Sequence, residues 1–326
     1  MKRREFLAWV GTTIVWSRQA PAQTSSSDFH VGTVTPGMPI SHNSPAGQIL
    51  LRVLGERGYR LGENLTFESR GAMREISLLP QMLQEMKANR VHVVIILGHP
   101  TAVAAKSVGI ATVIAYGAGD PVATGLVESL AHPGGTITGI SDDAAMLTTK
   151  RLSLLKELLP NLRGVAILWN RDDQAMMLRY EASAQAAQAL GITVQALAVK
   201  GPEDFNGVFA AMEKDPPDAL LMVSDSLTDS NRKRVYEYVV AKRLPAIYES
   251  DSLVRDGGLM SYGGDPKESF ERAAEMASRI LGGARPGDLP LEQPKRYPFI
   301  INLKVAKSMN LEIPSTLLAL ADEVIE

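Results

Sequence analysis

The chain has 326 residues, of which 34 are Lys or Arg and 36 are Asp or Glu, so its formal net charge is −2. That balance gives no electrostatic case for nucleic-acid binding, and the length suffices for two cores, because domains commonly have ~100–150 residues. The sequence has no cysteine, which excludes disulfides, thiol catalysis, cysteine-based metal sites and a lipid-modified cysteine. The 5 histidines form no HExxH motif or close pair, so we expect no metal and no cofactor.

Residues 1–22 have the pattern of an export signal. Arg3 and Arg4 precede Phe6-Leu7, as in twin-arginine signals. A modestly apolar segment follows, and Ala20-Pro21-Ala22 offers a cleavage site. An ordinary secretory signal is the alternative, and with either signal the protein leaves the cytoplasm. No later apolar run reaches ~18–20 residues, so we expect a mature protein that is soluble in the periplasm, with no membrane span.

From Phe29 onward, apolar runs that predict strands alternate with segments of helical periodicity. The expected strands of the first half are 29–34, 64–68, 91–97, 111–116 and 136–140. The expected helices are 44–57, 76–86, 99–108 and about 123–130. The run 91–97 is apolar on both faces, as in a central parallel strand. The alternation predicts a doubly wound parallel sheet with right-handed crossovers.

The second half repeats this alternation. The expected helices are about 147–158, 173–190, 205–212 and 235–240, and the expected strands are 164–170, 193–199, 219–223 and 244–248. The segment 257–265 is expected to return to the first lobe. A strongly amphipathic helix with Phe270 and Leu281 follows it, and then a linker over 286–294.

One long segment carries a family resemblance. GDPVATGLVESLAHPGGTITGIS, residues 119–141, resembles the signature of the ABC-transporter substrate-binding protein family related to the tryptophan and phenylalanine binders. It departs mainly at Thr136, where Asn is common. The matches extend from about Phe29 to the C-terminal ADEVIE. The resemblance implies a periplasmic-binding-protein type I fold with two doubly wound parallel-sheet lobes joined by a three-segment hinge. We expect residues 28–139 plus 262–290 in lobe one and 140–261 plus 291–326 in lobe two.

The same resemblance implies a solute receptor, acting as a monomer, that delivers a small molecule to an ABC permease in the inner membrane. Its ligand would be an amino acid or a related carboxylate, with an aromatic side chain as one option. A periplasmic sensory ligand-binding protein and a secreted enzyme are the alternatives. The sequence has no complete dinucleotide fingerprint, phosphate-binding loop or GxSxG elbow, so we do not expect an enzyme.

Ligands of open parallel sheets bind beyond the carboxyl ends of the strands, so residues 116–120 lie where a ligand would sit. The lobe-one candidates for ligand binding are Gly37, Gly98, His99, Thr101 and Asp120. Backbone N–H groups at the helix start after His99 would form an anion site, assisted by the Thr101 hydroxyl. Thr101 could instead be a first-turn residue, and Asp120 could accept its own backbone N–H groups. His99 would face either the ligand or solvent, and we expect solvent.

In lobe two, polar or aromatic residues again lie at strand ends. The candidates for ligand binding are Asn170, Asp225, Ser226, Tyr248, Glu249 and Tyr262. The resemblance places at Asp225 a carboxylate that meets a ligand amino group. Asp225 could instead cap the helix that follows it, and Asn170 could be a turn residue. The two tyrosines could form an apolar wall or belong to the core.

Overall fold

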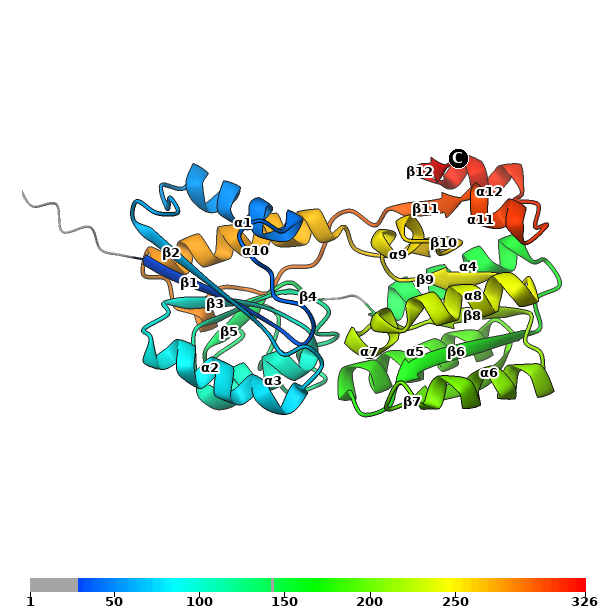
Figure 1. The fold of residues 1–326 in the computed structure, drawn as a ribbon, viewed down its shortest axis with the longest axis horizontal. Coiled ribbons are helices and arrows are strands. Elements are labelled where there is room, and N and C mark those ends of the chain that lie inside the picture. The colour runs from blue at the N-terminus through cyan, green and yellow to red at the C-terminus, as the bar shows by residue number, and fades with distance from the viewer. Residues whose placement is uncertain (1–28, 142–143) are drawn as a thin grey trace, which may run out of the picture.

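The computed structural model describes residues 29–141 and 144–326, which form two α/β lobes lying side by side (Figure 1). The expected export signal, residues 1–22, lies outside the described residues. None of the helices in the described ranges is long and apolar enough to span a membrane.

The sheet of the first lobe contains five parallel strands in the order β2-β1-β3-β4-β5. Their bounds are β1 (Phe29–Thr35), β2 (Leu65–Gly71), β3 (Val93–Leu97), β4 (Thr112–Tyr116) and β5 (Ile137–Gly139). The side chains of Val93 to Ile96 are all fully buried, because helices cover both faces of the sheet, as expected for a parallel sheet.

The helices of this lobe divide between the two faces of the sheet. They are α1 (Pro45–Glu56), η1 (Ile76–Leu78), α2 (Leu79–Ala88), α3 (His99–Val108), α10 (Pro266–Leu281) and η2 (Pro286–Asp288). Leu50 of α1 and Ala273 of α10 pack with Val93 and Ile95 on one face. The helices α2 and α3 pack on the other. Helix α1 begins after Ser44, whose Oγ accepts a hydrogen bond from the Gly47 N–H at 3.1 Å.

The second sheet has seven strands in the order β12-β11-β10-β9-β8-β6-β7. Their bounds are β6 (Gly164–Asn170), β7 (Thr193–Val199), β8 (Ala219–Met222), β9 (Ala246–Tyr248), β10 (Met260–Tyr262), β11 (Phe299–Asn302) and β12 (Glu323–Ile325). Neighbouring strands are parallel except β10 and β11. The expected pair of doubly wound parallel-sheet lobes is therefore confirmed, with one antiparallel pairing where the chain re-enters this sheet.

Helices also cover both faces of the second sheet. They are α4 (Ala144–Leu158), α5 (Gln174–Ala189), α6 (Asp204–Lys214), α7 (Ser226–Ser230), α8 (Arg232–Lys242), α9 (Asp251–Arg255), α11 (Leu303–Ser308) and α12 (Ser315–Leu320). One core cluster holds α4, α5, α11 and α12 against the sheet. The other holds α6, α8 and α9 against the opposite face.

Three segments connect the lobes: one follows β5, one follows β10, and one runs from η2 to β11. The first and third lie side by side, because Ser141 N donates to Glu292 O at 2.8 Å and Glu292 N donates to Gly139 O at 2.9 Å. Gly139 has φ 142°, and a Cβ there would lie 2.3 Å from Ile114 O. The first connection therefore requires glycine at this position.

The helix expected over 123–130 does not form. Residues 121–131 make successive turns, and Gly125 has φ 70°, a left-handed conformation that ends helical propagation. Leu126 and Val127 are nevertheless buried and pack in the core of the first lobe beside Ile137. The apolar residues of 123–130 therefore indicate burial and do not indicate a helix.

Candidate functional site

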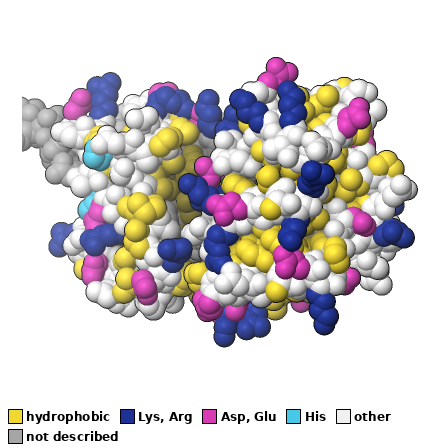
Figure 2. Space-filling view, turned by 45° about the vertical axis from the view of Figure 1, so that its right-hand side comes forward, with side chains coloured by type: hydrophobic (Ala, Val, Ile, Leu, Met, Phe, Trp, Pro, Cys, Tyr) yellow, Lys and Arg dark blue, Asp and Glu magenta, His cyan; other side chains and the backbone are white. Residues whose placement is uncertain are grey.

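A pocket lies between the two lobes, at the carboxyl ends of strands from both sheets. It encloses about 720 Å³, part of which is open to solvent. Figure 2 shows the hollow between the lobes, with hydrophobic side chains on the first-lobe side. This is the place where open parallel sheets bind ligands.

The first-lobe wall is mostly backbone and apolar side chains. It consists of Thr35, Pro36, Gly37 and Met38 after β1, Leu97, Gly98 and Pro100 after β3, and Tyr116 and Gly117 after β4. Gly98, with φ 79°, is the N-cap of α3, so that helix presents its N-terminus close to the pocket. Unpaired N–H groups and the positive end of the helix dipole favour an anion there.

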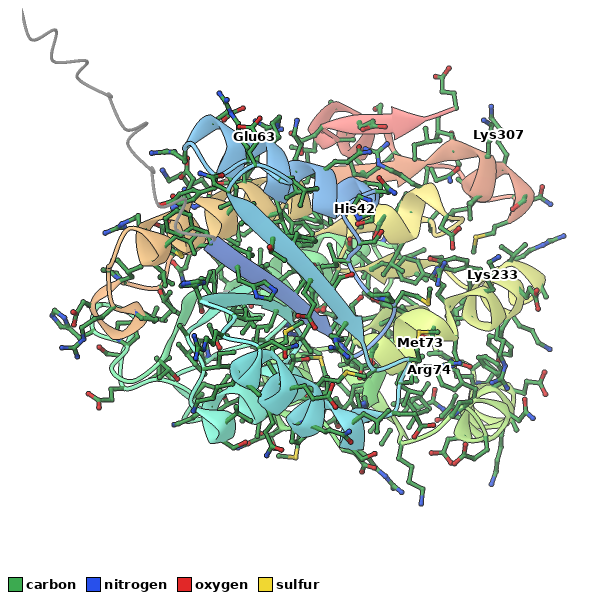
Figure 3. The ribbon with its side chains drawn as sticks, turned by 60° about the vertical axis from the view of Figure 1, so that its left-hand side comes forward. His42, Glu63, Met73, Arg74, Lys233 and Lys307 are labelled. Carbon is green, nitrogen blue, oxygen red and sulfur yellow. The ribbon has the colours of Figure 1, made fainter. Side chains whose placement is uncertain are left out.

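The loop after β2 is hydrogen-bonded to the backbone of this wall. Met73 N donates to Gly37 O at 3.0 Å, and Arg74 N donates to Pro36 O at 2.8 Å. Met38 lines the pocket with its side chain 70% exposed. Figure 3 shows Met73 and Arg74 beyond the end of β2, on the side of the first lobe that faces the second.

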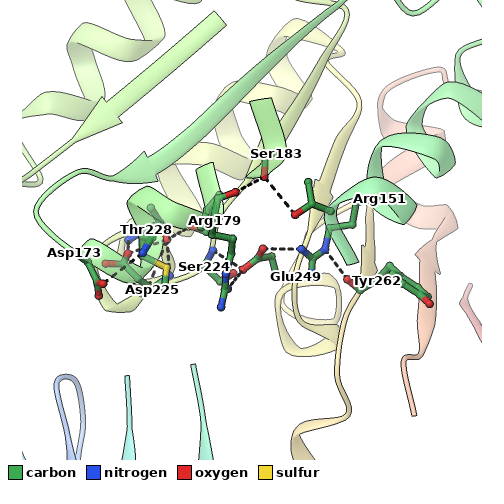
Figure 4. Close-up of polar contacts among 12 residues, drawn as sticks. Arg151, Asp173, Arg179, Ser183, Ser224, Asp225, Thr228, Glu249 and Tyr262 are labelled. Carbon is green, nitrogen blue, oxygen red and sulfur yellow. Dashed lines mark hydrogen bonds and ion pairs between the residues drawn. The ribbon is translucent and has the colours of Figure 1, made fainter. Parts of the chain in front are cut away.

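The second-lobe wall is polar and contains three carboxylates. It consists of Asp173, Ser224, Asp225, Ser226 and Asp229. Asp225 caps α7: its Oδ1 accepts hydrogen bonds from Leu227 N at 3.0 Å and Thr228 N at 2.8 Å. Its Oδ2 accepts one from Asn170 Nδ2 at 2.5 Å (Figure 4). Burial raises the pKa of Asp225, although these hydrogen bonds oppose the shift.

Asp229 lies one helical turn after Asp225 and has no comparable donors. Burial, and then the charge of Asp225, raise its pKa from the ordinary 3.8 to about 7. Within the described ranges, its buried Oδ1 has no hydrogen-bond partner, and neither has Ser224 Oγ. The Ser224 hydroxyl is near enough to favour the charged form of Asp229 slightly, but the two groups lack the geometry of a hydrogen bond.

His99 contacts the other lobe. Its Nδ1 lies 3.2 Å from Asp173 Oδ1, and its side chain is 6% exposed. Asp173 also caps α5, accepting from Ala175 N at 2.9 Å. The expectation that His99 faces solvent is wrong, because the second lobe packs over it. Thr101 is fully buried in α3, and neither residue is among those lining the pocket.

Glu249 belongs to a buried ion cluster and not to the pocket lining. Its carboxylate pairs with Arg151 Nη1 at 2.7 Å, with Arg179 Nη1, and with the Ser224 N–H at 3.1 Å (Figure 4). Burial alone would raise the pKa of Glu249, but the two arginine charges and the backbone donor hold it below its ordinary value. Arg151 Nε also donates to Tyr262 O at 2.7 Å, which ties α4 to the end of β10.

The other candidates lie outside the pocket lining. Asp120 is exposed and accepts from Val122 N at 2.9 Å and Ala123 N at 3.0 Å, so it caps its own turn. Tyr248 is fully buried in the core. The Tyr262 ring is half-buried and stacks on that of Tyr297, with the centroids 6.3 Å apart.

Two of the three pocket carboxylates were absent from the sequence candidates. Asp173 appears in the sequence only as the start of the helix expected over 173–190. Asp229 lies within α7 and follows its N-cap, Asp225, by four residues, a spacing that places Asp229 in the first turn of the helix above the cap. That spacing is the signal that could have found Asp229. No three His, Asp or Glu side chains in the described ranges gather into a metal-binding group.

Two α/β lobes with a shared pocket at facing strand ends have the periplasmic-binding-protein type I fold. Residues 38–325 match the model of the family described as ABC transporter substrate binding protein, and the chain belongs to that family. Proteins of this family are extracytoplasmic solute-binding proteins.

Individual relatives agree with this assignment. The chain is 23% identical over 263 residues to the tyrosine-binding protein of Clostridioides difficile, covering 80% of this chain and 75% of that protein. A conserved domain protein from Vibrio cholerae is similar in structure, with TM-score 0.84, 24% identity, and coverage of 91% of this chain and 99% of the other. An ABC domain from Streptococcus pneumonia in complex with L-Trp has TM-score 0.82 and 23% identity, with coverage of 92% and 100%.

Proposed function

We propose that this protein is the extracytoplasmic receptor of an ABC importer and that it binds an amino acid or a related carboxylate-bearing solute between its lobes. The pocket between the lobes carries the proposal, because its walls come from strand ends of both sheets. A ligand held there contacts both lobes at once and therefore favours their closed arrangement.

The two walls offer complementary charges to an amino acid. The N-terminus of α3 lies beside Gly98 and Pro100 in the first-lobe wall and suits a carboxylate. Asp225 lies in the opposite wall and suits an ammonium group. Met38, Leu97 and Tyr116 supply an apolar surface for a side chain between these ends. The tyrosine-binding relative and the structure with L-Trp support this ligand class.

The three connecting segments would form the hinge of a closing motion. Each is a single stretch of chain between two well-packed sheets, and hinge closure needs only a few connecting residues to change conformation. The lobes of the proposed receptor comprise residues 28–139 plus 262–290 and residues 140–261 plus 291–326. We propose that the receptor acts as a monomer and delivers its solute to ABC permease subunits.

Ligand-induced thermal stabilisation tests the proposal. L-tyrosine and L-tryptophan, at a hundredfold excess over a dissociation constant of ~1 μM, should stabilise the protein by ~2.7 kcal/mol. Asp225→Ser keeps a side chain that can cap α7 but removes the carboxylate. The variant should therefore lose most of the ligand-induced stabilisation. Asp120→Ser is the matched control, because Asp120 caps a turn outside the pocket lining.

The outcome separates two explanations. Equal ligand-induced shifts in Asp225→Ser and in the unmodified protein would exclude Asp225 from the binding site. The absence of any shift with either amino acid, across a concentration series, would exclude an aromatic amino acid as the ligand.

A further inference from the structure

The pocket between the lobes has an unbalanced charge. Its lining contains the carboxylates of Asp173, Asp225 and Asp229, while none of its lining residues in the described part of the chain is Lys, Arg or His. A zwitterionic amino acid brings one ammonium group and one carboxylate, so it supplies a single cation for these three acidic groups. The lining thus calls for more positive charge than an ordinary amino acid supplies.

Two of the three carboxylates have donors from the protein itself. Asp173 Oδ1 accepts from the first N–H groups of α5 and lies 3.2 Å from His99 Nδ1. Asp225 accepts from Asn170 Nδ2 and from the N–H groups of Leu227 and Thr228. These contacts stabilise negative charge at both positions without a ligand.

Asp229 is the exception. Its Oδ1 is buried without a hydrogen-bond partner, and Ser224 Oγ, on a residue 8% exposed in the same wall, also has none in the described part of the chain. Because both residues line the pocket, a ligand group can supply the partners that these two oxygens lack. An ammonium group suits both, because it supplies three donors and a positive charge.

Neighbouring charged groups do not fill this role. Arg232 is the cation nearest in sequence, but its Nε bonds Asp256 Oδ2 at 2.6 Å and its Nη1 donates to the backbone oxygen of Asp229 at 2.8 Å. Glu249, the other acid whose charge acts on Asp229, is already paired with Arg151 and Arg179. Burial and the Asp225 charge keep the pKa of Asp229 high, although the charge of Arg232 opposes the shift.

We propose that the ligand of this pocket carries a net positive charge, as a basic amino acid or an amine without a carboxylate does, and that Asp229 is the residue that selects it. The inference rests on the proposed function, because it concerns the same pocket. Asp225 would hold one ammonium group of a basic amino acid, and Asp229 with Ser224 would hold the second. A simple amine would place its single ammonium group between the two aspartates.

Calorimetry with two pairs of probes tests the inference. Tyramine and L-tyrosine share a phenol body, but only the amine has a net positive charge. L-lysine and L-norleucine share a side-chain length, but only lysine has a second ammonium group. We expect the charged member of at least one pair to bind about tenfold more tightly, which corresponds to about 1.4 kcal/mol. A preference within the lysine pair identifies a basic amino acid, whereas a preference within the tyramine pair alone identifies an amine and replaces the proposed carboxylate-bearing ligand class.

Variants of Asp229 assign the preference to this residue. Asp229→Asn should reduce it to within about twofold, whereas Asp229→Glu, which keeps the charge, should retain most of it. Asp215→Asn makes the same change at an exposed residue after α6, outside the pocket lining, and should leave the preference intact. Retention by Asp229→Glu and Asp215→Asn would exclude a general loss of folding or of net charge as the cause.

Three results would overturn the inference in distinguishable ways. If the zwitterions bind as tightly as their charged counterparts or more tightly, the proposed receptor function stands and the charge selection is wrong. If the preference survives Asp229→Asn, the selecting residue is wrong. If none of the four probes binds, both the inference and the proposed ligand class fail.

Discussion

Replacing Asp229 by asparagine should change how the stability of the ligand-free protein depends on pH. The pKa of Asp229 is about 7 in the folded protein, against an ordinary 3.8. Between these values the folded protein keeps a proton that the unfolded chain has released, so the free energy of unfolding falls as pH rises. The stabilising contribution is greatest below about pH 4 and is lost by about pH 7. Asparagine does not titrate, so the variant lacks this loss.

The magnitude follows from the size of the shift. Each pKa unit corresponds to 1.36 kcal/mol, so a shift of about three units gives about 4 kcal/mol as an upper limit. Solvent reaches part of the half-buried Asp229 side chain, which reduces the effect. From about pH 5 to about pH 8, we expect the variant to gain about 2 kcal/mol relative to the unmodified protein.

Urea denaturation followed by tryptophan fluorescence measures this difference. Trp169 is the one tryptophan in the sequence after the expected signal. It is 7% exposed and stacks on Tyr180 in the second lobe, so its emission reports unfolding of the lobe that contains Asp229. Asp215→Asn serves as the control and should follow the unmodified protein at every pH. A stability difference between Asp229→Asn and the unmodified protein that stays constant with pH, or shrinks as pH rises, would refute the reasoning.

Three further predictions concern other parts of the chain. Glu249→Gln removes the anion from two buried arginines, so it should lower the free energy of unfolding by about 3–5 kcal/mol; a loss below about 1 kcal/mol in urea denaturation would contradict this. Gly139→Ala should destabilise by more than about 2 kcal/mol, because its Cβ would lie 2.3 Å from Ile114 O. Gly207→Ala in α6, where a Cβ meets nothing within 4 Å, should stabilise the protein by about 0.5–1 kcal/mol. Similar melting temperatures for Gly139→Ala and Gly207→Ala would contradict the steric requirement for glycine at position 139. Replacing Arg3 and Arg4 by lysine should leave precursor in the cytoplasm, as cell fractionation would detect, because a receptor reads the twin arginines; normal export would indicate a general secretory signal.

The sequence predicted strands and helices correctly where the burial of apolar residues alone determines the secondary structure. The predicted strands 164–170 and 193–199 coincide with β6 and β7, because each apolar run is bounded by polar or turn-forming residues. The predicted helix over 123–130 was wrong, since one glycine with positive φ converts a buried apolar segment into turns. The antiparallel β11 could not be read from local patterns, because its direction depends on how the last connection returns to the sheet.

The site was harder to predict than the fold. Asp225 and Ser226 could be placed at the pocket because they lie within four residues of the end of a buried strand. Glu249 and Tyr248 also follow or end a strand, but the arginine cluster and the core enclose their side chains. The burial of His99 depends on the second lobe, which no local pattern describes. Strand position therefore indicates which end of a sheet a residue occupies, but not which neighbours its side chain meets.

The interleaved connections of the lobes impose an order on biosynthesis. The face of the first sheet that holds Val93 and Ile95 is covered partly by α10, so this lobe cannot finish packing until the ribosome has passed Leu281. The second sheet has β10 as an open edge until β11 and β12 emerge, and an exposed strand edge is a template for pairing between chains. Nascent chains that stop between Leu281 and Phe299 therefore carry an incomplete second lobe with an unpaired edge, and termination there yields aggregation-prone products instead of a shortened functional protein.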